Sequence, residues 1–182
     1  MKEKPMREDT TVALSVLREA VRNELDGKAM YTQAAERTRD ELGRSMFRSF
    51  AKEEEQHLHV LQVQYAKVNE SGEWIDVDEA RKKPRDPKLV LFPQEEGKVK
   101  EIIPEGASDL EALQIAIDFE RRAVRMYEQA ASESDDPTAQ AFYRELAEWE
   151  ETHYEILDNS YDYLANNGEW FFQEQEMPFY IG

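Results

Sequence analysis

The feature that most constrains the fold of this chain is an internal repeat of its own sequence. A shift of 96 residues aligns the chain with itself without a gap, and about a third of a roughly 60-residue window is then identical. The residues that recur 96 positions later are Leu14, Leu17, Ala20, Glu24, Met30, Tyr31, Ala34, Ala35, Asp40, Arg48, Ala51, Glu54, His57, Leu61, Tyr65, Gly72, Glu73 and Trp74. Such a repeat indicates a duplicated structural unit, so both halves are expected to fold alike.

Each repeat has the hydrophobic pattern of two helices joined by a short turn. Apolar residues recur at steps of three and four residues through most of each repeat. Asp40 and Asp136 are N-cap candidates in the two turns, and Ser108 opens the second repeat as the first residue of a capping box. We therefore predict two antiparallel helical hairpins, at residues 10–71 and 108–167.

The stretch between the hairpins, residues 72–107, breaks the helical pattern. The residues that interrupt any long helix are Pro84, Pro87, Pro93, Gly97, Pro104 and Gly106. Residues 88–92 and 98–103 are candidate short strands, and residues 78–83 are a candidate for one or two helical turns. A connection of this length suits a segment that runs along a bundle or reaches a second subunit. The predicted fold is all-α, a four-helix bundle of two duplicated hairpins joined by a long crossover.

The two ends of the chain differ in character. Residues 1–9 read as a polar lead-in, whereas residues 168–182 form a C-terminal aromatic tail. Trp170, Phe172 and Tyr180 are among its aromatic residues, and the tail is too apolar to be expected to extend into solvent without packing on other residues. We expect it to dock on the body of the protein or on another subunit.

Composition narrows the function classes. The chain has 182 residues and a formal net charge of −17, which argues against partners that need basic patches, such as nucleic acids and anionic membranes. It has no cysteine, which excludes disulfides, thiolate zinc sites, iron–sulfur clusters and cysteine nucleophiles. No apolar run approaches the ~20 residues of a membrane span, and the first residues lack the apolar core of a secretory signal. We expect a cytoplasmic protein.

Two Glu-x-x-His motifs occupy the same place in the two repeats. Residues three apart on a helix lie on one face, so the acid and the imidazole of each motif can touch the same ion. A further acid lies 30 residues before each motif, on the preceding helix. In each repeat, this acid and the Glu of the motif both lie ~21–24 Å from the turn that joins their two helices. The two side chains are therefore expected at the same level of the bundle. The six residues are Glu24, Glu54, His57, Glu120, Glu150 and His153.

The charges of these six side chains favour a pair of metal ions. Buried carboxylates without a compensating charge are strongly unfavourable, and four carboxylates match the charge of two divalent cations. Oxygen-rich ligation with one imidazole per metal suits iron or manganese, and zinc is a further possibility. The competing interpretation is that all these acids lie on the solvated surface, which requires the helical phase to be wrong on four helices.

At these residues the sequence resembles the ferritin-like di-iron carboxylate superfamily, and rubrerythrin-like proteins most closely. The resemblance covers about residues 10–71 and 108–167, and it implies a ferritin-like bundle that holds two iron ions. By position, Glu24 and Glu120 become terminal ligands, the Glu of each motif bridges the metals, and each His binds one of them. Tyr31 and Tyr127 lie seven residues after the terminal acids, where family members carry a tyrosine near the metals. Ordinary aromatic core is the alternative for both.

Several departures from the family limit what the resemblance implies. Without cysteine there is no rubredoxin site, so electrons must come from an external donor. Ala123 stands where rubrerythrin has an extra acid, which weakens the case for peroxide specialisation. Glu55 stands where bacterioferritin has a haem-ligating methionine, so no haem is expected. Glu53, Glu55 and Glu151 are expected to be solvated, and contact with the metal ligands is the alternative for them. His59 is expected to lie on the surface.

The leading functional hypothesis is a di-iron oxidoreductase. It would reduce hydrogen peroxide or O₂, as a peroxidase or a ferroxidase, in oxidative-stress defence or iron handling. One alternative is an iron-binding or storage module without significant turnover, and another is a structural metal-binding bundle. The long crossover allows helix exchange between subunits, so we expect a homodimer.

Overall fold

The computed structural model describes residues 8–84, 91–92 and 101–170. Its helices in chain order are α1 (Glu8–Arg37), α2 (Glu41–Ser71), α3 (Val77–Lys82), α4 (Asp109–Glu133) and α5 (Pro137–Asn167). The four long helices correspond to the two predicted hairpins, and α3 corresponds to the predicted helical turns in the crossover. The predicted all-α fold is confirmed, since the described residues contain no strand.

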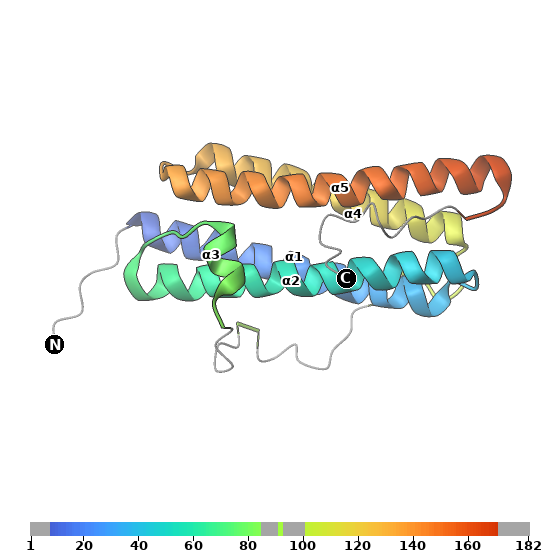
Figure 1. Ribbon diagram of the computed structural model, residues 1–182, viewed down its shortest axis with the longest axis horizontal. Coiled ribbons are helices and arrows are strands. Elements are labelled where there is room, and N and C mark those ends of the chain that lie inside the picture. Colours follow the sequence, from blue (N-terminus) through green and yellow to red (C-terminus); the bar gives the residue numbers. More distant parts are fainter. Residues whose placement is uncertain (1–7, 85–90, 93–100, 171–182) are drawn as a thin grey trace.

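The two hairpins form two layers of one bundle. In Figure 1 the pair α4 and α5 lies above the pair α1 and α2, and all four helices run along the long axis of the molecule. Contacts within each pair are extensive, and α1 also packs against α4. None of the helices in the described part of the chain combines the length and apolar character that crossing a membrane requires.

Helix ends follow the repeat. The Asp40 carboxylate accepts hydrogen bonds from the first backbone N–H groups of α2, and the Asp136 carboxylate does the same for α5. Ser108 and Glu111 form the predicted capping box at the start of α4. Gly72 and Gly168 end α2 and α5 at φ of 71° and 70°, a left-handed conformation that glycine adopts without a steric penalty. The same local chemistry therefore sets the length of both hairpins.

The apolar core has two clusters, one towards each end of the bundle. One cluster contains Leu17, Leu61 and Leu146, and the other contains Phe47 and Leu113. Between them, at the middle of the four long helices, lies a layer of buried charged side chains. The candidate site therefore lies between two apolar clusters, which shield it from solvent towards both ends of the bundle.

The crossover is anchored on the bundle by glutamine side chains. The Gln33 side-chain oxygen accepts hydrogen bonds from the backbone N–H groups of Ile102 and Ile103, at 2.9 and 3.1 Å. The Gln64 side-chain oxygen accepts one from the N–H of Ile75 at 3.2 Å. These bonds satisfy loop backbone groups that would otherwise be buried without partners.

The two candidate strands of the crossover are not formed where the structure describes them. Residues 91–92 and 101–103 have no strand conformation, and the rest of both segments lies outside the described residues. The described parts are instead held to the bundle by side chains. The Phe92 ring, for example, lies under the Arg22 guanidinium, 4.2 Å from it.

The C-terminal tail begins by docking on the bundle. The Trp170 ring packs edge-on against Phe47 at 5.8 Å between centroids, and its indole N–H donates to the Asp109 carboxylate at 2.9 Å. The remainder of the predicted aromatic tail, residues 171–182, lies outside the described residues.

The contact of Trp170 with Gly43 generates a stability prediction. A Cβ atom at Gly43 would lie 2.6 Å from Trp170 Cε2 and 2.8 Å from Thr38 Cγ2. We expect Gly43→Ala to lower the free energy of unfolding by about 1–3 kcal/mol, because the indole must shift away. Urea unfolding followed by circular dichroism measures this. Gly106→Ala is the control, since nothing lies within 4 Å of its added Cβ. Equal losses in both variants would contradict the packing argument.

Candidate metal centre

The six residues singled out by the repeat converge in the middle of the bundle. α1 and α4 each contribute one acid, and α2 and α5 each contribute a Glu-x-x-His motif. All six side chains are at most 1% exposed. The residues brought together are Glu24, Glu54, His57, Glu120, Glu150 and His153. The competing interpretation of solvated surface acids is therefore wrong for these four acids.

One half of the cluster surrounds His57. Its Nδ1 lies 3.2 Å from Glu24 Oε2, 3.3 Å from Glu150 Oε1 and 4.0 Å from Glu54 Oε2. One ligand atom from each of these four residues lies within 4.8 Å of all the others. Four such atoms at this separation are close enough to bind one cation together.

The other half surrounds His153 in the same way. Its Nδ1 lies 3.3 Å from Glu54 Oε1, 3.3 Å from Glu150 Oε2 and 3.7 Å from Glu120 Oε1. These four residues also offer ligand atoms within 4.8 Å of one another.

The two halves share two carboxylates. Glu54 and Glu150 belong to both groups, whereas Glu24 belongs only to the first and Glu120 only to the second. Two adjacent positions with two common carboxylates are the arrangement that a pair of bridged metal ions requires. The division into shared and unshared acids matches the bridging and terminal roles that the family resemblance implies.

Several buried polar atoms of the cluster lack a hydrogen-bond partner, and two bound cations would account for them better than hydrogen bonds do. Glu54 Oε1, Glu120 Oε2, Glu150 Oε1 and His153 Nδ1 are buried and make no hydrogen bond of good geometry among the described residues. Buried polar groups in this state are costly, and four of them in one cavity is unusual. A metal ion coordinated by each half would satisfy these atoms, so the donor set fits a dinuclear site.

Burial and mutual repulsion shift the acids in the metal-free protein. Burial raises the pKa of Glu54 well above its ordinary value, and the charges of Glu24 and Glu150 add to the effect. Burial likewise raises the pKa of Glu120 to about 8, with a further contribution from Glu150. Burial alone would also raise the pKa of Glu150, but the two imidazoles outweigh it and lower that pKa.

The imidazoles shift in the opposite sense to what burial alone would cause. Burial lowers the pKa of His57, but Glu150 and Glu24 outweigh it and raise that pKa to about 9. For His153 burial is likewise outweighed, by the surrounding carboxylates, Glu120 first, and the pKa is raised. Without metal, protons therefore supply the positive charge that the carboxylates need.

Two tyrosines tie the terminal acids across the repeats. The Tyr31 hydroxyl donates to Glu120, and the Tyr127 hydroxyl donates to Glu24. Burial, followed by the adjacent carboxylate, raises the pKa of both phenols, which keeps them protonated as donors. Each repeat thus orients the terminal acid of the other, and the two tyrosines are part of the polar cluster rather than plain aromatic core.

Glu53 was predicted to be solvated, and that prediction is wrong. Its side chain is 4% exposed, and its carboxylate Oε2 lies 3.2 Å from His153 Nε2. The Nδ1 atom of His153 is left facing the cluster. An available signal was its position four residues before His57, which places it on the inner face of α2. Glu55 and Glu151 are exposed as predicted, and Glu55 pairs with Lys28 at 3.3 Å.

The two repeats differ at Glu53, because the residue 96 positions later is Trp149. Its ring stacks on His57 at 4.6 Å between centroids with an interplanar angle of 26°. One imidazole therefore has a carboxylate beside it on its outer side and the other has an indole. His59 is partly exposed and belongs to none of the clusters of possible ligands among the described residues.

Gly27 makes room for one of the shared acids. A Cβ atom there would lie 3.1 Å from Glu54 Oε2 and 3.1 Å from Phe119 Cε1. The small residue on α1 thus allows the carboxylate to approach the helix closely.

Comparison with known families agrees with this geometry. The family model described as rubrerythrin matches residues 15–161, which include most of each long helix and all six clustered residues. The chain belongs to the rubrerythrin family. A search of curated proteins gives no match. The resemblance inferred from the sequence is therefore confirmed at the level of the family, and membership in the rubrerythrin family suggests a di-iron centre at the buried His and Glu cluster.

The raised pKa values predict how metal affinity depends on pH. At pH 7 the metal-free protein holds protons on His57, with a pKa of about 9, and on Glu120, with a pKa of about 8. A metal ion must displace them, so affinity should rise from pH 6 to pH 9, and binding should release at least these two protons per chain at pH 7, since the pKa values of Glu54 and His153 are raised as well. Calorimetric Mn²⁺ titrations in buffers of different ionisation enthalpy measure this release. A binding enthalpy independent of the buffer would contradict the assignment.

Glu53 and Glu55 form a matched pair for a second prediction. We expect Glu53→Gln to weaken metal binding about 10-fold and Glu53→Leu about 100-fold, because His153 loses the carboxylate that orients it. Glu55→Gln should bind as the wild type does, since Glu55 is exposed. Mn²⁺ titration followed by electron paramagnetic resonance gives the affinities. Wild-type affinity in Glu53→Leu would rule out the orienting role.

Proposed function

We propose that this chain is a di-iron oxidoreductase that reduces hydrogen peroxide or O₂ with electrons from an external donor. The observation that carries the proposal is the pair of four-residue groups that share Glu54 and Glu150. Terminal ligation by Glu24 and Glu120, bridging by the shared acids, and one imidazole per metal are part of it. Membership in the rubrerythrin family supports the same assignment.

Iron is the metal that suits the proposed chemistry best. The donor set is six oxygen- and nitrogen-bearing side chains without a thiolate, which favours iron or manganese over a cysteine-type zinc site. Two bound iron ions would supply the two electrons that convert one hydrogen peroxide and two protons into two water molecules. The same pair of electrons, together with two protons, would take O₂ to hydrogen peroxide.

The chain itself would position the metal ligands, balance the charge of the metal ions and provide two buried tyrosine hydroxyl groups. Four carboxylates neutralise two divalent ions, which makes the buried site electrically tolerable. Tyr31 and Tyr127 hold the terminal acids in place by hydrogen bonds and keep their protons. The apolar clusters on both sides keep bulk water out, which strengthens every interaction within the site.

The proposal covers both peroxidase and ferroxidase activity. Ala123 is buried where peroxide-specialised relatives carry an extra acid, so this chain has no ligand at that position. Oxidative-stress defence or iron handling in the cytoplasm, and a dimeric assembly, belong to the same proposal. Iron storage without turnover is the alternative, and iron content separates the two.

The proposal is tested by loading the protein with Fe²⁺ without oxygen and adding hydrogen peroxide or O₂. We expect saturation at two iron ions per chain, one equivalent of peroxide consumed per chain, and continued consumption when a reductant is present. The double variant Glu54→Ala with Glu150→Ala should lose both metal and activity, because each half loses its shared ligands.

The matched control is Glu55→Ala with Glu151→Ala, which changes the next residue of each motif and should leave both properties intact. Accumulation of many iron ions per chain without peroxide consumption would indicate storage instead. Retention of two iron ions by the first double variant would overturn the site itself.

A further inference from the structure

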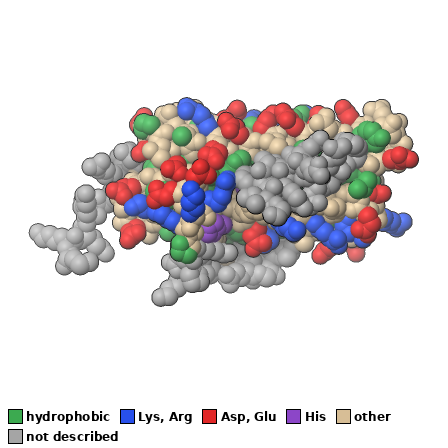
Figure 2. All heavy atoms as spheres, in the orientation of Figure 1, with side chains coloured by type: hydrophobic (Ala, Val, Ile, Leu, Met, Phe, Trp, Pro, Cys, Tyr) green, Lys and Arg blue, Asp and Glu red, His purple; other side chains and the backbone are tan. Residues whose placement is uncertain are grey.

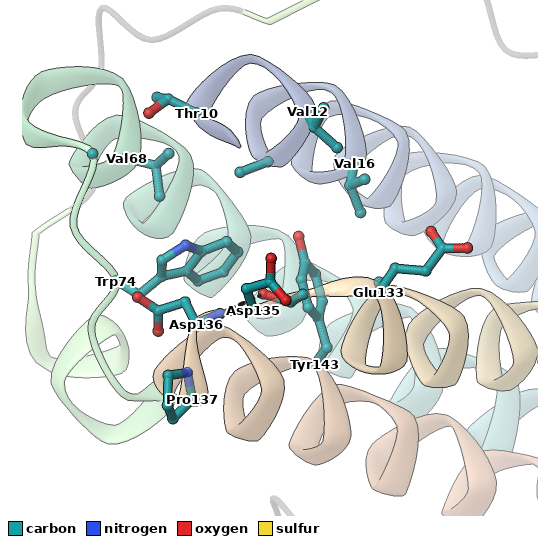
Figure 3. Close-up of a pocket in the computed structure, with 14 residues that line it drawn as sticks. Thr10, Val12, Val16, Val68, Trp74, Glu133, Asp135, Asp136, Pro137 and Tyr143 are labelled. Carbon is teal, nitrogen blue, oxygen red and sulfur yellow. Dashed lines mark hydrogen bonds between the residues drawn. The ribbon is translucent and has the colours of Figure 1, made fainter. Parts of the chain in front are cut away.

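A cavity of about 470 Å³ lies at one end of the bundle, away from the candidate metal centre. It is lined by the beginning of α1, the end of α2 and the turn between α4 and α5 (Figure 3). Its walls are apolar at Val16 and Val68 and aromatic at Trp74 and Tyr143. Tyr143 lies seven residues before Glu150 on α5, which is ~10 Å along the helix. The cavity is thus separate from the acids of the centre.

Tyr143 gives this cavity a buried polar group that needs a partner. The side chain is 2% exposed, and its hydroxyl has no hydrogen-bond partner among the described residues. Figure 3 shows the hydroxyl pointing from α5 towards α1, into the space beside Trp74 and Val16. Burial raises the pKa of Tyr143, so the hydroxyl stays protonated. A buried hydroxyl without a partner is costly, which indicates that something else satisfies it.

The internal repeat shows that the cavity is not a general property of the fold. Trp74 packs edge-on against Tyr143 at 5.2 Å between centroids, much as Trp170 packs against Phe47 at the opposite end. Trp170 also donates its indole N–H to Asp109 at 2.9 Å. At the cavity end the residues equivalent to Phe47 and Asp109 are Tyr143 and Ala13. The first exchange adds the hydroxyl, and the second removes both the partner of the tryptophan and the volume that would fill the space.

Two acidic positions at the cavity also differ in the sign of their charge from the positions aligned with them at the opposite end. Glu133 and Asp135 line the cavity, whereas the equivalent residues at the closed end are Arg37 and Arg39. The described residues that line the cavity include no lysine or arginine. Both acids are exposed, so they place negative charge at the rim of the cavity. The face of an indole such as that of Trp74 also attracts positive charge, so the lining favours a cation.

The surface around this end does not itself carry a single sign of charge. On the face shown in Figure 2, acidic and basic side chains are interspersed, as expected for a solvated surface. Any preference for a cation would therefore come from the lining of the cavity rather than from the whole face.

We propose that this cavity binds a small organic ammonium ion with an apolar body. The ammonium group lies between the Asp135 carboxylate and the Tyr143 hydroxyl, to whose oxygen it donates a hydrogen bond. The exposed Glu133, which also accepts a hydrogen bond from Gln129 Nε2 at 2.7 Å, adds negative charge at the rim. The apolar body lies against Val16, Val68 and the Trp74 ring. A cavity of 470 Å³ is within the range of small-molecule sites, and a lining with few polar groups is typical of them. This site does not depend on the proposed function.

The test uses full-length metal-free protein and 2-phenylethylammonium as the probe, with 2-phenylethanol as its neutral match. Binding is followed by NMR on the three indole N–H signals, which Trp74→Phe assigns. We expect the Trp74 signal to shift, and the amine to bind at least about tenfold more tightly than the alcohol. Equal affinity for the two probes, or no shift of the Trp74 signal, would overturn the proposal.

Two sets of variants keep the proposal falsifiable without disturbing the fold. Tyr143→Phe removes only the hydroxyl and restores the residue type found at the closed end; it should weaken amine binding about tenfold. Glu133→Gln with Asp135→Asn should weaken it about fivefold and reduce its salt dependence. Glu155→Gln with Asp162→Asn changes net charge equally on the distant part of α5 and should have no effect. Unchanged amine affinity in both cavity variants would contradict the assigned contacts.

Discussion

Four buried carboxylates and two buried imidazoles lie close together at the middle of the bundle. Burying these groups costs free energy, and the rest of the structure must compensate for that cost. Carboxylates cannot be taken out of water in such numbers without compensating positive charge. In the metal-free protein, protons on the imidazoles and on two acids supply part of it. A pair of divalent cations would match the charge of the four clustered carboxylates, and would also satisfy the polar atoms of the cluster that hydrogen bonding leaves without a partner.

The surrounding architecture follows from the need to hold these groups together. Two antiparallel hairpins place one acid and one Glu-x-x-His motif at the same level in each layer, and apolar clusters close the layer above and below. Tyr31 and Tyr127 then tie each layer to the terminal acid of the other. Duplication explains the near-symmetry of the cluster. The exchange of Glu53 for Trp149 between the repeats makes the surroundings of the two imidazoles different.

Much of this arrangement was predictable because each repeat provides independent evidence for the pattern found in the other. One Glu-x-x-His motif in an acidic chain says little, whereas two in register, each 30 residues after another acid, require a common level in the bundle. Caps such as Asp40 and Gly72 were also predictable, because they depend on local backbone chemistry. The family followed from the same residues.

What the sequence could not provide depends on packing between segments far apart. Glu53 sits in a run of three acids and looks solvated until α5 is placed over it. The bonds from Gln33 and Gln64 to the crossover backbone depend on where the loop passes, which no periodicity encodes. The candidate strands failed for the same reason in their described parts. The end cavity emerges only when the two ends of the bundle are compared in three dimensions.

The most direct test of the central claim is anomalous X-ray diffraction at the iron edge from crystals soaked anaerobically in Fe²⁺. Two peaks about 3.5–4 Å apart, between Glu54 and Glu150 and next to His57 and His153, are the predicted result. Absence of peaks at the cluster, with iron found only on the surface acids, would contradict it.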